Sequence, residues 1–404
     1  MSTPTARDVP PDLQAFQRPR PAVDVPKIAL RQKTVEPLIR VNVTPGGANS
    51  VKLEVRGLFS LVSLETKQTL AKDLSMGPII VSASKSGLKL GSSHFDSARL
   101  EIVPETPSAV RVNGHLYRGR VRLYRRTDAQ VSAVNVLPIE AYLASVVDAE
   151  MPAKFPDQAR QAQAIVARTY ALYQMQQADP NAVFDVFASQ RSQKYLGLEY
   201  LDPTGRRLAG ESESSRRLVE ATRGVVCHRH GQLFCAYYSA VCGGETTNGQ
   251  GVFKDAADVL TSVPCTWCHE SPHYRWTKEI ARSLFQQRAA KSDEQAAGSL
   301  AIRKVEQSAG PGGGVISQFE FSDGKQRWSW NGIELREKLP VGTVFSPHFR
   351  IRLEPEQVII EGRGHGHGVG FCQWGAKGQA EAGHRCDEIV KYYYPGANLV
   401  TLNY

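Results

Sequence analysis

The chain has 404 residues, of which 41% are hydrophobic, and a formal charge of +9 from 49 basic and 40 acidic side chains. It is long enough for two or three domains with sizeable cores. No stretch approaches about 18 uninterrupted apolar residues, and the first residues hold no apolar run of signal-peptide length, so we expect neither a transmembrane helix nor a signal peptide in this sequence.

The positive charge would favour an anionic polymer, such as a cell-wall strand or a nucleic acid, through long-range attraction. The basic residues are scattered, and the short cluster at 118–126 fits the solvated face of a strand equally well. Because no nucleic-acid-binding motif accompanies them, we expect no nucleic-acid partner.

In chain order, residues 1–36 are rich in proline, arginine and aspartate and predict a disordered or loosely attached arm. Residues 37–134 are short alternating apolar stretches between turn-forming residues, a pattern typical of β-strands. Residues 135–404 mix helical and strand patterns, including an expected charged helix at 280–300 and a turn at 311–314. The chain is therefore predicted to be α+β, with a β-rich N-terminal part, a central helical pair and a mixed C-terminal part.

The central helical pair meets at a short acidic loop that carries Glu150. The first helix is expected to begin at Pro138 and to end near Glu150, because Pro152 disfavours a helical residue before it. The second is expected to begin at Pro156 and to run to about residue 177. A glutamate at such a bend is most often a solvated surface group.

The cysteine spacing indicates a metal site. Cys265 and Cys268 form a C-x2-C pair, His273 follows, and a predicted hairpin brings Cys242 to a Gly-Gly turn. Three thiolates and one imidazole would complete a tetrahedral zinc site, with His269 as the competing ligand. A disulfide or a redox pair remains the alternative for the C-x2-C pair. The remaining cysteines are interpreted as small buried apolar residues, namely Cys227, Cys235, Cys372 and Cys386.

The C-terminal segment 362–396 passes from a strand through a glycine-rich loop into a helix near Gln373. Alternating glycines allow close approach of a ligand to the backbone, and the imidazoles of His365 and His367 can bond sugar hydroxyls. Two alternatives remain open: the two histidines bind a second metal, or the glycines serve only a tight turn.

Four segments together resemble the signature of the SpoIID/LytB domain family. They are YLASVVDAEMP at 142–152, ARTYA at 167–171, the SQ-x-Y-x-G stretch at 192–197 and the glycine-rich segment 362–396. Members of this family are peptidoglycan-cleaving lytic transglycosylases, which are glycan-cleaving lyases, or enhancers of a cell-wall amidase. The resemblance therefore implies peptidoglycan glycan strands as the partner, an amidase as a further candidate partner, and a location in the cell envelope outside the cytoplasm.

Carried onto this chain, the resemblance implies that Glu150 is the catalytic acid and base. One carboxyl group suffices in a transglycosylase because the 6-hydroxyl of the substrate attacks in place of water. Nearby tyrosine and methionine side chains would raise the pKa of Glu150 by burying it. We expect Glu140→Gln and Asp148→Asn, at the neighbouring acids, to stay active. The residues expected to position the sugars are Arg168, Tyr170, Gln193, Tyr195, His365, His367 and Gln373.

The resemblance also supports one structural zinc ion per chain, held by Cys242, Cys265, Cys268 and His273. A non-catalytic cell-wall-binding module that enhances an amidase is the main alternative function. A zinc hydrolase is a third, but it would need an open metal position that four protein ligands do not leave.

Overall fold

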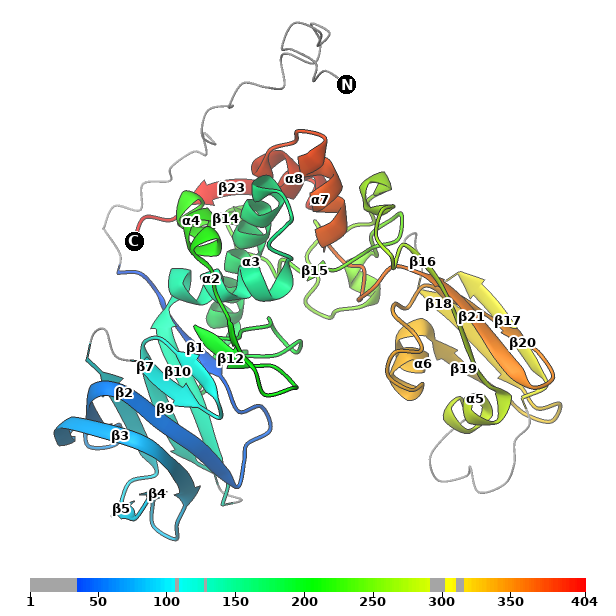
Figure 1. Ribbon diagram of the computed structural model, residues 1–404. Coiled ribbons are helices and arrows are strands. Elements are labelled where there is room, and N and C mark those ends of the chain that lie inside the picture. The colour runs from blue at the N-terminus through cyan, green and yellow to red at the C-terminus, as the bar shows by residue number, and fades with distance from the viewer. Residues whose placement is uncertain (1–34, 106–108, 127–128, 291–301, 310–315) are drawn as a thin grey trace, which may run out of the picture.

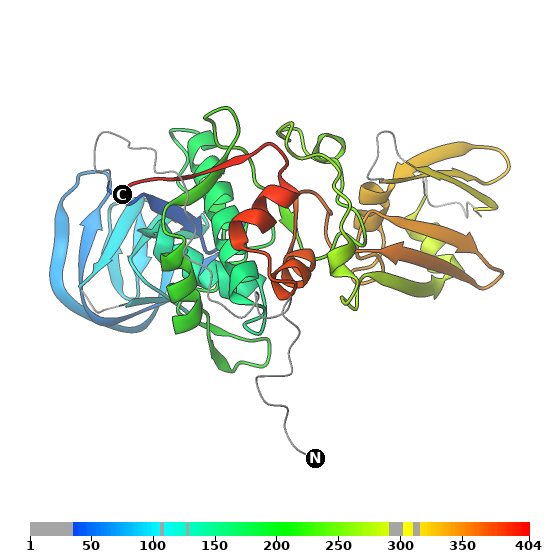
Figure 2. The ribbon, with the colours of Figure 1, turned by 90° about the horizontal axis from the view of Figure 1, so that it is seen from above.

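The computed structural model describes residues 35–105, 109–126, 129–290, 302–309 and 316–404. Figures 1 and 2 show three parts in a row: a β-rich N-terminal part, a central part dominated by helices, and a second β-rich part formed by residues 275–363. The predicted α+β class is confirmed. The arm expected at 1–36 lies outside the described residues except for its last two, and the turn at 311–314 lies outside them entirely.

The N-terminal part is a strongly curled sheet. Among the described residues its main path runs β11-β1-β10-β9-β6-β2-β7-β8-β12-β13, with β3, β4 and β5 branching from β2. Its strands are β1 (Leu38–Asn42), β2 (Ser50–Ser63), β3 (Thr69–Ala83), β4 (Leu88–Leu90), β5 (Ser93–Phe95), β6 (Arg99–Pro104), β7 (Ala109–Val112), β8 (His115–Tyr117), β9 (Arg120–Arg125), β10 (Val131–Pro138), β11 (Val186–Phe187), β12 (Glu199–Leu201) and β13 (Arg207–Ala209). Buried and exposed residues alternate along much of β2, so one of its faces packs on the core.

The central part begins where β10 passes directly into α2. Its helices are α2 (Ile139–Glu150), α3 (Asp157–Gln177), α4 (Glu213–Ala221), α7 (Gln373–Glu381) and α8 (Cys386–Tyr393). Two short sheets join them, β14 (Val225–His228) with β23 (Asn398–Thr401), and β15 (Tyr238–Ser239) with β22 (Phe371–Cys372). The predicted bounds of the helical pair are confirmed, because Met151 adopts an extended conformation directly after Glu150.

Two buried ion pairs stabilise this helical part. Arg168 of α3 is fully buried and bonds both carboxylate oxygens of Glu140, at 2.9 and 2.7 Å. Arg160, also on α3, pairs with Asp148 of α2 and is 1% exposed. Because one pair lies near the start of α2 and the other near its end, together they fix the packing of α3 against α2.

The second β-rich part, which we call the inserted unit (275–363), lies between the C-x2-C loop and the glycine-rich loop. It contains the sheets β16-β21-β20 and β17-β18-β19. Its elements are β16 (Arg275–Ala281), α5 (Arg282–Arg288), β17 (Lys304–Ala309), β18 (Ser317–Ser322), β19 (Arg327–Asn331), α6 (Gly332–Lys338), β20 (Phe349–Leu353) and β21 (Gln357–Arg363), and two 3-10 turns precede it, η1 (Gly249–Gly251) and η2 (Thr266–Cys268). It has an apolar core of its own. Of the helix expected at 280–300, residues 282–288 form α5, β16 continues to Ala281, and residues 291–300 lie outside the described residues.

Candidate functional site

Glu150 is the last residue of α2 and lies half-buried where three separate segments meet. The backbone N–H of Lys194 donates to its carboxylate at 2.8 Å. Burial raises the pKa of Glu150, and the polar groups of Lys194, Gln373 and Tyr238 offset only part of that rise. The surroundings of the carboxyl group therefore favour its protonated form, the form in which a general acid acts.

Gln193 lies beneath this carboxyl group and is completely buried. It accepts a hydrogen bond from the Tyr142 hydroxyl at 3.0 Å and donates to the carbonyl of Ala167 at 3.3 Å. The loop after α3 is thereby tied to both helices of the central pair. Gln193 thus holds in place the loop whose Lys194 amide bonds Glu150.

Two buried polar groups in this region make no hydrogen bond of ordinary length and angle among the described residues: the Tyr238 hydroxyl and the Nε2 of Gln163. Tyr238 also has its pKa raised, mainly by burial and then by the nearby Glu150 charge. Gln373, the first residue of α7, donates to Gln163 Oε1 at 3.3 Å. Since an unpaired buried polar group costs about 1–3 kcal/mol, these groups favour a hydroxyl-rich ligand that would satisfy them.

Tyr170 belongs to the same surroundings, because its ring lies 6.1 Å from that of Tyr237 and 6.4 Å from that of Tyr238. Tyr237 in turn stacks on Phe253 with their ring centroids 3.7 Å apart. Both Tyr237 and Phe253 are half-exposed. They form an aromatic patch next to the polar groups around Glu150, a combination suited to the apolar and polar faces of a sugar ring.

The glycine-rich loop depends on backbone conformations that favour glycine. Gly364, Gly366, Gly368 and Gly370 all have positive φ angles, from 69° to 99°. A Cβ atom on Gly370 would lie 2.2 Å from the carbonyl oxygen of Tyr237. The loop is therefore packed against the segment that carries Tyr238, and tight packing accounts for at least this glycine.

The two histidines of this loop face different surroundings. His367 accepts a hydrogen bond from the Val369 amide at 3.1 Å, and burial lowers its pKa to about 4. His365 instead packs against His273 and Phe345, with centroid distances of 4.7 and 5.5 Å. Within the described residues neither imidazole belongs to a group of three candidate metal ligands. His367 is therefore neutral near pH 7. Its ring lies 5.9 Å from that of Tyr237.

Arg168 and Tyr195 lie in the protein interior. Besides its bonds to Glu140, Arg168 donates to the carbonyl of Val225 at 3.0 Å. The Tyr195 hydroxyl donates to Asn135 at 2.7 Å and its ring lies 5.0 Å from that of Tyr142. Of the residues expected to contact sugars, the structure gathers Tyr170, Gln193 and Gln373 around Glu150, whereas these two contact it only through others.

Glu140 and Asp148, the acids not expected to take part in catalysis, each pair with a buried arginine. Glu140 accepts hydrogen bonds from Arg168, from the Gly224 amide at 3.2 Å and from the Tyr404 hydroxyl. Its pKa is lowered, since Arg168 and these donors outweigh its burial. Substitution at either acid would leave a buried arginine without its partner.

The four cysteines that meet in the structure are Cys242, Cys265, Cys268 and Cys372, whose sulfur atoms all lie within 4.8 Å of one another. All four are buried free thiols. Within the described residues His273 is not part of this group, in which Cys372 occupies the place expected for the fourth ligand. The parallel pairing of β15 with β22 brings Cys372 next to the turn after β15, although 130 residues separate it from Cys242 in the chain.

This cluster fits a zinc ion. A tetrahedral site with sulfur ligands at about 2.3 Å has sulfur–sulfur edges of about 3.8 Å. Here the Cys242 and Cys268 sulfurs are 3.6 Å apart. The amides of Cys242 and Gly375 each donate to the Cys372 sulfur at 3.3 Å, which is typical support for a metal thiolate. Cys372 lies directly before the start of α7. Because the N-terminus of a helix favours a thiolate, this position was a signal in the sequence that could have identified Cys372 as a ligand.

The cysteine cluster is also connected to the Glu150 site. It joins the turn after β15, the C-x2-C loop and the start of α7. Cys372 immediately precedes Gln373, whose side chain faces Glu150. A metal bound here would therefore fix the orientation of α7 and of Gln373.

None of the helices within the described residues has the length and apolar character that crossing a membrane requires.

Comparison with known proteins gives concordant matches. The family model described as stage II sporulation protein matches residues 127–228. The stage II sporulation protein D of Bacillus subtilis is 30% identical over 292 residues, covering 69% of this chain and 78% of that protein. An uncharacterised protein of Brachyspira hyodysenteriae is 28% identical over 366 residues, covering 91% of this chain and 94% of that protein. The amidase enhancer of B. subtilis is 24% identical, and its match covers 85% of this chain but only 53% of that protein.

Proposed function

The chain belongs to the stage II sporulation protein D family, and from that membership we propose that it acts on the cell wall as a lytic transglycosylase of peptidoglycan glycan strands. The observation that carries this proposal is the environment of Glu150. Burial raises its pKa, unpaired polar groups surround it, and it lies where three signature segments converge. Because its substrate would be the cell wall, the protein would work outside the cytoplasm.

In the proposed reaction Glu150 starts protonated and gives its proton to the glycosidic oxygen as the bond to the anomeric carbon breaks. The resulting carboxylate then takes the proton of the 6-hydroxyl on the same sugar, whose oxygen bonds the anomeric carbon. The products are a shortened strand and a 1,6-anhydro end. No water is consumed, and Glu150 ends protonated as it began.

Within the described residues the groups that act most on Glu150 are Lys194, Gln373 and Tyr238, and none of them is an acid, which supports this route. Ordinary glycosidases need a second carboxylate to activate water or to form a covalent intermediate. The acids nearest along α2 are committed elsewhere, Glu140 to Arg168 and Asp148 to Arg160. The polar side chains that act on Glu150 are Gln373 and Tyr238, which can orient hydroxyl groups but not replace a carboxylate base.

We propose that the cysteine cluster binds one structural zinc ion through Cys242, Cys265, Cys268 and Cys372. Such an ion would contribute folding free energy and no reaction chemistry, because four protein ligands leave no open coordination position. The zinc-hydrolase alternative is disfavoured for the same reason.

The test is mass spectrometry of soluble products after purified protein is incubated with purified sacculi. We expect 1,6-anhydro-muropeptides from the parent chain and none above background from Glu150→Gln. Reducing ends without anhydro products would identify a hydrolase and contradict the proposal.

A second function has support from one observation, the match to the amidase enhancer over 85% of this chain. In that case the protein would bind the wall and stimulate an amidase without cutting glycan. Unchanged sacculi after incubation with the protein alone, together with faster peptide release by an added cell-wall amidase, would favour this second function.

A further inference from the structure

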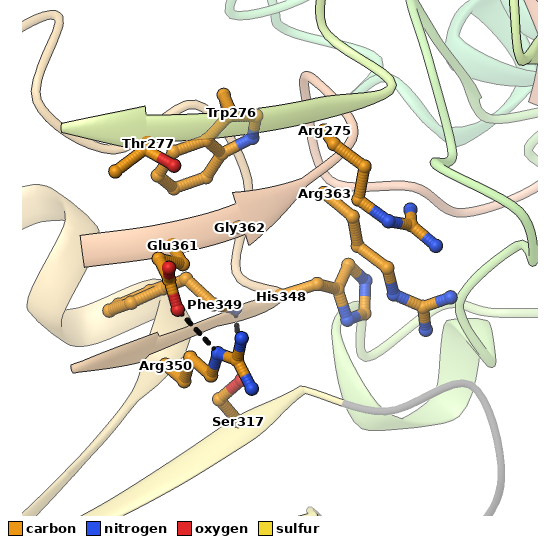
Figure 3. Close-up of a pocket in the computed structure, with 10 residues that line it drawn as sticks. All are labelled: Arg275, Trp276, Thr277, Ser317, His348, Phe349, Arg350, Glu361, Gly362 and Arg363. Atoms are coloured by element: carbon orange, nitrogen blue, oxygen red, sulfur yellow. Dashed lines mark hydrogen bonds and ion pairs between the residues drawn. The ribbon is translucent and has the colours of Figure 1, made fainter. Parts of the chain in front are cut away.

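A pocket of about 690 Å³ lies on the inserted unit, away from Glu150. It forms on one face of the sheet β16-β21-β20, with Ser317 of β18 closing one side (Figure 3). Because side chains alternate between the faces of a strand, the opposite face carries the apolar residues that fill the core of this unit. The pocket lining combines polar and charged side chains with Trp276 and Phe349, which also belong to that core.

The lining of this pocket is strongly basic. It includes three arginines, Arg275, Arg350 and Arg363, and one acid, Glu361. Arg350 is paired with that acid, its Nε donating at 2.7 Å. Figure 3 shows Arg275 and Arg363 extending side by side at the other end of the sheet, next to His348. Two guanidinium groups therefore face the pocket beyond the one that Glu361 neutralises.

Arg275 and Arg363 have weak charge compensation in the described structure. They are direct cross-strand neighbours, and like charges at such positions repel. The carboxylate closest to Arg363 is that of Glu245, at 4.0 Å. Arg275 donates to the carbonyls of Gly243 and Tyr274, at 2.6 and 3.1 Å, and its guanidinium lies over the Tyr274 ring. An anion between the two arginines would relieve their repulsion.

The pocket is physically connected to the Glu150 site. Its residue His348 bonds Thr247 at 2.7 Å, and the Thr247 amide donates to Gly368 of the glycine-rich loop at 2.9 Å. The loop itself begins at Gly362 and Arg363, which line the pocket, and ends at Gln373 beside Glu150. One continuous segment of the chain therefore joins the two places.

We propose that this arginine pocket binds a carboxylate carried by the glycan strand, at a subsite away from the cleavage point. The inference rests on the proposed function, which supplies the identity of the polymer. Guanidinium groups bind carboxylates through paired, charge-assisted hydrogen bonds, and two adjacent arginines can hold one carboxylate from both sides. The carboxylate could belong to the lactyl group of muramic acid or to the attached peptide, two sources of the same chemistry.

The test measures strand binding in the Glu150→Gln background, so that cleavage does not interfere. The probes are glycan strands stripped of peptides, strands that keep their peptides, and a neutral N-acetylglucosamine hexamer. Arg363→Gln is compared with Arg352→Gln, a matched control two residues from Arg350 on the same strand face that does not line the pocket. Arg275→Gln serves as the second variant should Arg363→Gln fail to fold.

We expect Arg363→Gln to weaken binding of at least one carboxylate-bearing strand about tenfold or more, the loss typical of a charge-assisted hydrogen-bond pair. Binding of the neutral hexamer and binding by Arg352→Gln should be unchanged. A loss confined to stripped strands would assign the lactyl group, and a loss confined to peptide-bearing strands would assign the peptide.

Equal affinity of the folded arginine variants and the control for all three probes would overturn the inference and leave the proposed transglycosylase untouched. Conversely, arginine-dependent binding by a chain that releases no anhydro products would refute the proposed function alone. The two proposals therefore fail separately.

Discussion

Replacing Glu150 by glutamine separates chemistry from structure at the proposed catalytic centre. The glutamine carbonyl can still accept the hydrogen bond that the Lys194 amide donates at 2.8 Å, so the end of α2 should keep its shape. The amide cannot transfer a proton. Since the same carboxyl group would act first as acid and then as base, both steps lose their catalyst. We expect a rate loss of about 10⁴-fold, the upper end of the range for one positioned proton-transfer group.

The same substitution should stabilise the fold at neutral pH. Burial raises the folded-state pKa of Glu150 above its unfolded value, so the folded state prefers the protonated form. The contribution of Glu150 to the free energy of unfolding is therefore fully present at a pH below its pKa in the unfolded chain. It is lost as the pH rises through its pKa in the folded protein. Removing the ionisable group should therefore raise the free energy of unfolding near pH 7. We expect roughly 0.5–2 kcal/mol, the gain that a single stabilising substitution commonly gives.

Two measurements check this reasoning. Product release from sacculi, followed by mass spectrometry between pH 4 and 8, should show parent activity falling as the pH rises through the raised pKa of Glu150, and no such profile for Glu150→Gln. Urea unfolding of both chains at pH 5 and pH 8 should show the stability gain only at the higher pH. Parent-level release of anhydro products by the variant would refute the catalytic role, and a stability loss at pH 8 would refute the electrostatic account.

Three further predictions follow from the same contacts. Glu140→Gln should lower the free energy of unfolding by about 3–5 kcal/mol, because it leaves the buried Arg168 charge unpaired; denaturant unfolding measures this, and a loss under 1 kcal/mol would contradict it. Cys372→Ser should reduce the zinc content per chain, whereas His273→Ala should leave it unchanged. Metal analysis showing the reverse would favour His273 over Cys372 as the fourth ligand. Tyr238→Phe should keep or slightly raise the melting temperature, because it removes an unpaired buried hydroxyl, while lowering kcat/KM; unchanged kinetics would show that this hydroxyl does not meet the substrate.

Several features of the site could be predicted because they depend on neighbouring residues alone. The prolines before and after α2, and its apolar periodicity, determine where that helix ends, and so they place Glu150 at a bend. The alternating pattern of residues 37–134 likewise indicated strands, and the α+β class is confirmed. Three of the four predicted zinc ligands meet in one cluster, because the C-x2-C pair and the Gly-Gly turn after Cys242 are local signals.

Tertiary structure alone decided which distant residues meet. Cys372 joins the cluster in place of His273 because β22 pairs with β15, a contact between segments 130 residues apart that no local pattern reports. Arg168 lies within a signature motif, yet packing turns it inward to Glu140, whereas Gln373 acts on Glu150 and Gln193 precedes the Lys194 amide that bonds it. Local periodicity determines which helices and strands form. The surroundings of each side chain depend instead on the burial of apolar surface between distant segments, and that burial determines which motif residues reach the site.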